Sequence, residues 1–362
     1  MTNPDRQRDW LRLMAVPGIG VVRANQLLAV FGSPAAVFAA AKRRLREVDG
    51  ISDSIAAALS AGPDEGSVDG QLETCRRLGA AIVSRDDPGY PPLLRRLPDA
   101  PPLLFVRGTL PPPTAGTVAV VGSRTASQYG KRMAETLARG LAARGIAVVS
   151  GMARGIDTAA HRGALEAGGR TVAVLGCGVD RCYPPENAAL RDRIIHGGAV
   201  VSEYPFGAEP LAGHFPSRNR IITGMSLGTV AVEAREDSGV FSSVRWASDQ
   251  GREVFAVPGP VTAATSVGTN RLIKQGAKLV QSVEDILEEL AVTAPPPAPQ
   301  PPRPQPDGAE LPVFQALQDA PLHIDLIAQG SKLDTAAALR ILLALELKGM
   351  ARQLPGKLFV RA

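Results

Sequence analysis

The chain has 362 residues, of which 45% are hydrophobic and 21% charged, a composition that predicts two or three folded domains and excludes intrinsic disorder. It contains no run of about 18 apolar residues, so we expect no membrane span, and its first residues lack the apolar stretch of a signal peptide. The net charge of +5 permits an anionic partner. The three cysteines predict a cytoplasmic location, without a disulfide framework or a zinc site.

Residues 1–62 are predicted to form a small helical domain. A hydrophobic–glycine–hydrophobic turn occurs twice, at 16–20 before a helix over 21–31 and at 48–52 before a helix over 53–60. The pattern resembles tandem helix-hairpin-helix motifs, whose turn amides can hold a DNA phosphate, although such repeats also serve only as packing modules. We expect a short linker from Gly62 to Gly70, where glycine, proline and acidic residues gather.

The middle of the chain, residues 71–291, alternates apolar strands with helices. Strands are expected at 117–121, 146–150, 171–175, 199–202, 229–233 and 253–257. Helices are expected at 130–143, 157–167, 186–196, 217–226 and 240–250. This alternation predicts an α/β fold, an extended Rossmann-like core with a doubly wound, mostly parallel sheet covered on both faces. Ligands of such folds bind at the carboxyl ends of the strands.

Loops of small polar residues follow the predicted strands and contain the candidate binding groups. Glycines let the backbone approach a ligand and aim amides at it, so several such loops on one edge form a cradle for an anion, most simply phosphate. The candidates in these loops are Gly122, Ser123, Arg124, Ser150, Gly151, Arg154, Asn187 and Gly259.

A second cluster of candidates opens the helix over 217–226. It comprises Phe215, Arg218, Asn219 and Arg220. Arginine and asparagine at a helix N-terminus suit phosphate oxygens and base edges. The alternative is that one of these arginines forms a structural ion pair with Glu203 or Glu233.

Nucleotide fingerprints are absent. The sequence GSRTASQYG after the first core strand does not match the GxGxxG of dinucleotide sites, and Gly130-Lys131-Arg132 does not match the end of a Walker A loop. The fold therefore favours a phosphate ligand, while the fingerprints argue against NAD and ATP.

Catalytic chemistry also has little support in the sequence. No motif places His161 beside a serine nucleophile, and GxSxG is absent. Acids at the strand ends could bind Mg²⁺ or transfer protons, but we favour roles as helix caps and partners of arginine. They are Asp157, Asp180, Glu203, Glu233 and Asp237. We expect no catalytic residue, no metal and no enzymatic activity.

Nine motifs of the middle segment follow, in order and spacing, those of the DNA-processing protein A (DprA/Smf) family, which the chain resembles. They are GSRxxSxYG (122–130), SGxAxGID (150–157), AH (160–161), LGCGxDxxYPxxN (175–187), SEYP (202–205), FPxRNRII (215–222), VEAxxxSG (232–239), GRxVFAVPG (251–259) and GTNRLIxxGA (268–277).

The resemblance implies a single-stranded DNA-binding protein that protects incoming strands during natural transformation and loads a RecA-type recombinase on them. It implies a homodimer through the core, involving the segment Asn270–Leu279, and no nucleotide cofactor. The family's DNA pocket corresponds here to Gly122, Ser123, Arg124, Arg218, Asn219 and Arg220. Some members have a DNA-binding lysine where this chain has Pro185, so positive charge would come from residues such as Arg154, Arg181 or Lys131.

Residues 292–308 read as a proline-rich linker, and residues 309–362 as a winged-helix domain. Its helices are expected at 309–319, 322–329 and 334–348, before a hairpin around 354–357. Winged helices often read duplex DNA with the third helix, but this one is mostly apolar. We therefore favour protein contact or weak DNA tethering for this domain.

Three functions remain as hypotheses at this stage. The first is the single-strand binder and recombinase mediator. The second is a nucleotide or nucleoside-phosphate hydrolase with a Rossmann-like fold, since similar glycine loops occur in such enzymes. The third is a duplex-binding regulator acting through the winged helix. The missing fingerprints and the lack of a placed nucleophile favour the first.

Overall fold

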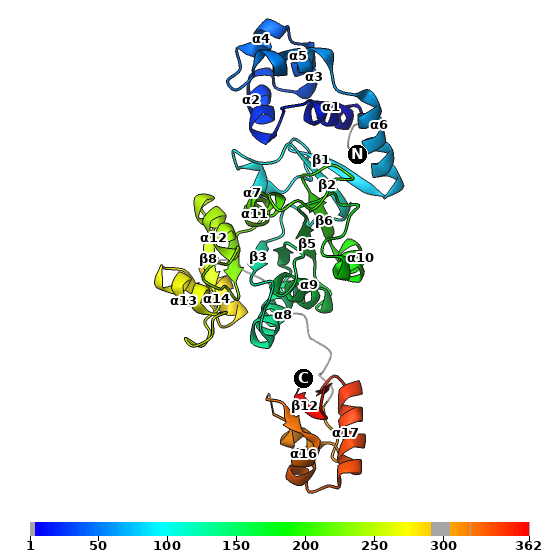
Figure 1. Ribbon diagram of the computed structural model, residues 1–362, viewed down its shortest axis with the longest axis vertical. Helices are drawn as coiled ribbons and strands as arrows, with labels where there is room; N and C mark the ends of the chain where they lie inside the picture. The colour runs from blue at the N-terminus through cyan, green and yellow to red at the C-terminus, as the bar shows by residue number, and fades with distance from the viewer. Residues whose placement is uncertain (1–3, 291–304, 319, 362) are drawn as a thin grey trace. The chain divides into compact units, whose positions relative to one another are not determined.

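The computed structural model describes residues 4–290, 305–318 and 320–361, which belong to two compact units, residues 1–297 and 298–362 (Figure 1). Most of the predicted proline-rich linker, residues 292–304, lies outside the described residues. Within the described ranges, no helix combines the length and the apolar character that crossing a membrane requires.

The first unit begins with a bundle of short helices. They are α1 (Pro4–Ala15), α2 (Val21–Phe31), α3 (Pro34–Ala39), α4 (Lys42–Arg46) and α5 (Asp53–Ala61). Gly18 and Gly50 precede α2 and α5 with φ of +84° and +76°, a left-handed conformation that glycine adopts without strain. The two predicted helices of this region are confirmed.

The predicted linker from Gly62 to Gly70 is wrong. Helix α6 (Glu65–Arg77) begins inside it, and the Asp64 side chain caps this helix by accepting a hydrogen bond from the Gly66 amide at 3.1 Å. Although glycines and acidic residues gather in this segment, α6 still has apolar side chains on one face, and two of them, Val68 and Cys75, are buried.

A nine-stranded sheet forms the centre of the first unit. Its strands are β1 (Ala80–Ser84), β2 (Leu103–Gly108), β3 (Thr117–Val121), β4 (Ala147–Ser150), β5 (Thr171–Val174), β6 (Ala199–Ser202), β7 (Gly228–Ala231), β8 (Glu253–Ala256) and β9 (Lys278–Leu279). Their order is β1-β2-β6-β5-β4-β3-β7-β8-β9, with only β1–β2 and β2–β6 antiparallel. The predicted doubly wound, mostly parallel sheet is confirmed, and the antiparallel β1–β2 extension is an addition.

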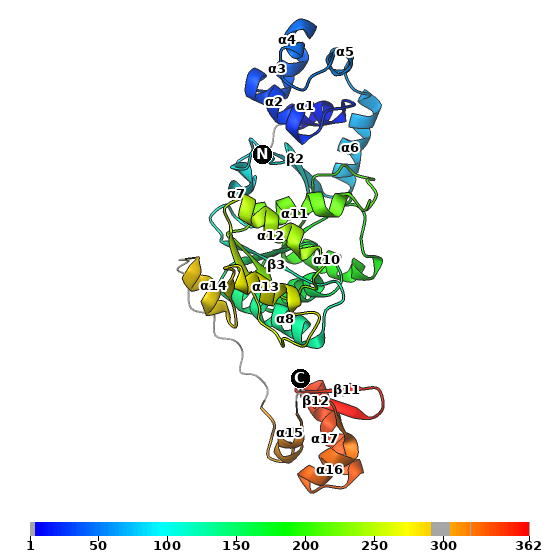
Figure 2. The same cartoon turned by 60° about the vertical axis from the view of Figure 1, so that its left-hand side comes forward.

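Helices cover both faces of this sheet (Figures 1 and 2). In β3, Val118 and Val120 pack with α8 and α9, whereas Ala119 and Val121 pack on the opposite face with α11 and α12. The first face has α8 (Gln128–Ala143), α9 (Ile156–Glu166), α10 (Ala188–Gly197) and α14 (Val283–Glu289). The second face has α7 (Pro92–Arg95), α11 (His214–Gly224), α12 (Val240–Asp249) and α13 (Val267–Lys274). A 3-10 turn, Pro185–Asn187, precedes α10.

The second unit is a winged helix, as predicted. It contains α15 (Leu311–Ala316), β10 (Leu322–His323), α16 (Ile324–Ser331), α17 (Thr335–Leu347), β11 (Ala351–Leu354) and β12 (Leu358–Arg361). The three strands form an antiparallel sheet in the order β10-β12-β11. Leu339, Leu343 and Leu347 of α17 are exposed at a spacing of four residues, which places them on one face of the helix.

The N-terminal helices are tied to the sheet through Trp10. This side chain is 1% exposed and belongs to the apolar cluster that contains Val68, Ile82 and Phe105. Trp10→Ala should therefore lower the stability of the first unit by about 3–5 kcal/mol. Truncation after Leu290 should leave the melting temperature of that unit unchanged, because it removes no member of this cluster. Thermal denaturation followed by circular dichroism tests both, and a large shift on truncation would contradict the division into two units.

Candidate nucleic-acid interface

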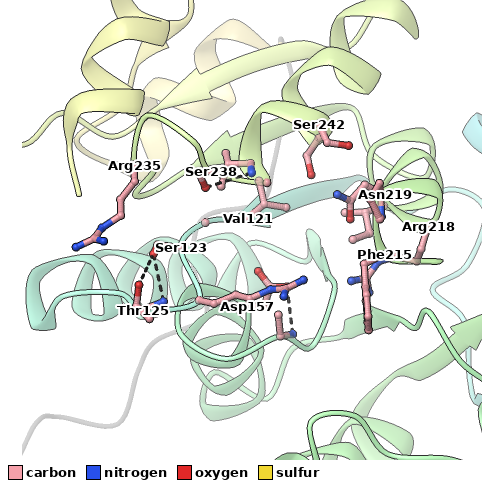
Figure 3. A pocket seen from close by; sticks show the side chains of 18 of the residues that line it. Val121, Ser123, Thr125, Asp157, Phe215, Arg218, Asn219, Arg235, Ser238 and Ser242 are labelled. Carbon is pink, nitrogen blue, oxygen red and sulfur yellow. Dashed lines mark hydrogen bonds between the residues drawn. The ribbon is translucent and has the colours of Figure 1, made fainter. Parts of the chain in front are cut away.

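A pocket of about 570 Å³ opens at the carboxyl ends of β3 and β7, in the middle of the sheet. The chain winds outward from this point in both directions, since β4 follows β3 on one side and β8 follows β7 on the other. Crevices at such a reversal of strand order are where doubly wound folds bind ligands. Figure 3 shows Phe215 and Asn219 on one side of the pocket and Arg235 on the other.

Six of the predicted residues line this pocket: Gly122, Ser123, Arg124, Phe215, Arg218 and Asn219. Gly151 and Arg154 line a smaller hollow that also contacts Arg124 and Phe215. Ser150, Arg220 and Gly259 line neither, and Asn187 lines a third hollow. The structure thus brings most of the predicted residues together. Some of them are exposed in the hollows, whereas others are buried and support the loops behind them.

Arg124 is an exposed cation that lines the pocket. Its guanidinium carbon lies 5.4 Å from the centroid of the Phe215 ring. Among the described residues no carboxylate pairs with it. The loop beneath is fixed, because the Ser123 amide donates to the Glu233 carbonyl at 2.8 Å and the Ser123 hydroxyl accepts from the Thr125 amide at 3.2 Å. The positive charge of Arg124 is therefore available to an anionic ligand.

Arg218 is buried behind the pocket surface, with 4% exposure. Its guanidinium donates to the carbonyls of Gly151, at 2.8 Å, and Val174. Burial lowers the pKa of Arg218 to about 10, although the nearby Asp157 carboxylate opposes the shift. Arg218 thus remains charged at neutral pH and joins the ends of β4 and β5.

The loop after β4 is held by side chains that point into the protein. Asp157 accepts from the amides of Gly151, at 3.1 Å, and Ala153, at 3.2 Å, and burial raises the pKa of this carboxyl. The side-chain amide nitrogen of Asn187 donates to the Met152 carbonyl at 2.9 Å. These contacts fix the backbone from which Arg154 projects.

Three predicted residues have structural partners instead of a place in the pocket. Arg220 pairs with Glu203, and both side chains are 10% exposed, so the ion-pair alternative weighed for these arginines describes Arg220. The Ser150 hydroxyl donates to the Val120 carbonyl at 2.7 Å. Gly259 exchanges hydrogen bonds with the Asn270 side chain, which anchors the loop after β8 to α13.

Several lining residues were missed in the sequence. They are Thr125, Tyr183, Arg235, Ser238 and Ser242. Arg235 and Ser238 fall within the VEAxxxSG motif, which follows β7, but only the adjacency of β7 and β3 places them opposite the Ser123 loop. Tyr183 packs against Phe215 with ring centroids 5.4 Å apart, so the pocket has two neighbouring aromatic rings.

Glu233, Asp180 and His161, which were considered for catalysis, are engaged with other groups, whereas Asp237 is exposed and lines the main pocket. Glu233 accepts from both the amide and the hydroxyl of Ser127, and Asp180 accepts from the Gly207 amide. His161 is fully buried against the Thr171 hydroxyl, and burial lowers its pKa to about 3. Across the described ranges, no group of three or more His, Cys, Asp or Glu side chains is arranged to hold a metal ion.

Three family models match successive parts of the chain. They are a SAM-like helix-hairpin-helix tandem over residues 11–61, DNA recombination-mediator protein A over 81–291, and a DprA winged helix domain over 295–357. The chain belongs to the DprA/Smf family. It is 41% identical to Protein Smf of Escherichia coli over 283 residues, which covers 76% of each protein. It is 46% identical to DNA processing protein DprA of Streptococcus pneumoniae over 204 residues, 56% of this chain and 72% of that protein.

Two solved structures of the family resemble this DprA/Smf chain. DNA processing protein A from Streptococcus pneumoniae superposes with a TM-score of 0.71 at 35% identity, covering 78% of this chain and 97% of that one. The Helicobacter pylori protein, described for its single-stranded DNA binding mode, superposes with a TM-score of 0.52 at 29% identity, covering 59% and 95%.

The two pocket arginines should respond differently to the same substitution. Arg218→Met leaves two buried carbonyls without their donor, and each unsatisfied buried group costs about 1–3 kcal/mol. Arg124→Met, on the exposed side of the same pocket, should change stability by less than about 0.5 kcal/mol. Urea denaturation of the two variants measures the difference. Equal losses would contradict the division of the arginines into supporting and surface groups.

Proposed function

We propose that this DprA/Smf protein binds single-stranded DNA in the pocket between β3 and β7. The observation that carries the proposal is the unpaired guanidinium of Arg124 beside the rings of Phe215 and Tyr183. A phosphate can form charge-assisted hydrogen bonds with Arg124, while an unpaired base stacks on the aromatic rings. The relative from Helicobacter pylori, whose structure is described for its single-stranded DNA binding mode, supports the same ligand.

The proposal includes the wider role that the family resemblance implies. The protein protects incoming single strands during natural transformation and loads a RecA-type recombinase on them. It acts as a binder without catalysis, in the cytoplasm. The exposed leucines of α17 support a protein-contact role for the winged helix, because an apolar face suits a protein better than a phosphate backbone.

A nucleotide or nucleoside-phosphate hydrolase is the competing function. Such an enzyme needs a base or nucleophile directed at the ligand. Of the two acids that line the pocket, Asp157 already accepts two backbone amides, and Asp237 is exposed with no histidine among the lining residues to assist it. Competition distinguishes the two functions. Oligo-dT should displace a labelled single strand from the pocket, while AMP, ATP and NAD should not. Displacement by a mononucleotide together with its hydrolysis would favour the enzyme.

Arg124→Ala should weaken single-strand binding by at least about tenfold, since a hydrogen bond to a charged group contributes about 1.5–3 kcal/mol. The loss should be similar for different base sequences, because phosphate contacts carry no sequence information. The slope of log affinity against log salt should flatten by about 0.7, the value for one lost contact to a single strand. Fluorescence anisotropy across a salt series measures both quantities.

Two variants control the Arg124 experiment. Arg124→Lys should recover only part of the affinity, because an ammonium cannot form the bidentate fork. Arg132→Ala removes an exposed cation of α8 that does not line the pocket, so it should leave the affinity close to that of the parent protein. An unchanged salt slope in Arg124→Ala would remove this residue from the site.

We propose a homodimer through the edge of the core formed by α13 and β9. Leu272 of α13 is buried within the protomer, whereas Leu279 of the two-residue edge strand β9 is 40% exposed. An edge strand offers unpaired backbone groups to a second chain. Sedimentation equilibrium at micromolar concentration should show a dimer, and Leu279→Asp should shift it toward monomer. A parent protein that is monomeric under these conditions would refute the dimer.

A further inference from the structure

A hollow of about 240 Å³ lies beside the main pocket, between the N-terminal parts of α8 and α9. It is lined by three cations and two carboxylates, with backbone from the start of α9 between them. The charged residues are Lys131, Arg154, Arg162, Glu135 and Glu186. Neither Lys131 nor Arg162 forms an ion pair within the described part of the chain, so both side chains can bind an anion.

Two arginines connect this hollow to the main pocket. Arg124 lines both the main pocket and the small hollow beside it. Arg154 lines that small hollow and also the α8–α9 hollow. The three concave surfaces therefore adjoin one another, and a cation stands at each junction.

The backbone at the junction leaves no room for an intervening side chain. Gly155 has a φ of +75°, and a Cβ atom there would lie 2.3 Å from the Ser123 carbonyl oxygen. Ser123 lines the main pocket and Gly155 lines the α8–α9 hollow. The loops after β3 and β4 thus touch directly, which keeps the two binding surfaces within one short stretch of polymer.

Without bound DNA, the Arg154 guanidinium already has an ion-pair partner. Its guanidinium pairs with Glu186, although both side chains are about half exposed, at 57% and 51%. An exposed ion pair is weak, so a phosphate can replace the carboxylate. Glu186 then acts as an internal competitor for the DNA backbone.

We propose that a single strand bound in the main pocket continues past Arg154 into the α8–α9 hollow, where Lys131 and Arg162 bind further phosphates and the strand displaces Glu186. The inference rests on the proposed single-strand binding. It adds an exit path for the strand and a residue, Glu186, that limits affinity. A mononucleotide cannot use this path, since it has no phosphodiester backbone that continues into the hollow.

Strand length tests the path. Oligo-dT of about 15 nucleotides can reach both surfaces, whereas oligo-dT of about five can occupy only one. The double variant Lys131→Ala/Arg162→Ala should weaken binding of the longer strand at least tenfold. Its salt slope should flatten by about 1.4, twice the single-contact value. Binding of the short strand should stay within about twofold. Arg132→Ala, a neighbouring exposed cation outside the hollow, is the control and should change neither.

Glu186→Gln should have the opposite effect on affinity for the longer strand. It releases Arg154, so affinity for the longer strand should rise by about two- to fivefold, with an unchanged melting temperature. A merely structural pair would give no gain. The path is overturned if the double variant binds the longer strand like the parent, or if Glu186→Gln binds it no more tightly. Failure of the parent protein to bind either strand would instead refute the proposed function.

Discussion

The site depends on one buried charge, the guanidinium of Arg218 at the carboxyl ends of β4 and β5. An unpaired buried cation would destabilise the fold through its desolvation free energy. Two carbonyls that accept hydrogen bonds and the negative charge of Asp157 offset this loss of hydration. The arrangement requires glycine at position 151, where a Cβ atom would lie 2.6 Å from the Arg218 guanidinium. The close approach of backbone and arginine therefore fixes the loop that presents Arg154, and with it the floor of the pocket.

The segment Arg218–Arg220 shows how one motif serves two purposes. Successive helical residues point about 100° apart, so Arg218 and Arg220 project toward different neighbours. Arg218 meets the strand ends, and Arg220 meets Glu203 beyond β6. Asn219, between them, is half-buried and lines the pocket. Both arginines stabilise the fold, so Arg124 and Arg154 on the loops are the exposed arginines of the predicted set.

The sequence predicted the sheet because its buried strands are continuous apolar runs, and it located the loops that line the pocket because glycines follow those strands. It could not predict the partners of each side chain. Arg124 after a strand and Arg218 at a helix start were both candidate ligand-binding arginines in the sequence, and only the three-dimensional packing buries one and exposes the other. The contribution of Arg235 was missed for a related reason, since the pairing of β3 with β7 joins segments far apart in the chain. Helix α6 was missed because local composition outweighed a buried stripe of only a few residues.

The same packing gives a physical reason why this Rossmann-like core would select a polymer over a dinucleotide. In dinucleotide-binding folds the pyrophosphate occupies the N-terminus of the helix that follows the first strand. Here that helix is α8, and its N-terminal Ser127 donates both its amide and its hydroxyl to the Glu233 carboxylate. Gly130 is required for this approach, since a Cβ atom there would lie 2.4 Å from the Glu233 side chain. The protein's own carboxylate fills the phosphate position, so an external anion must be bound by side chains on the neighbouring loops. Those side chains line adjoining open hollows, a geometry suited to a backbone that passes through.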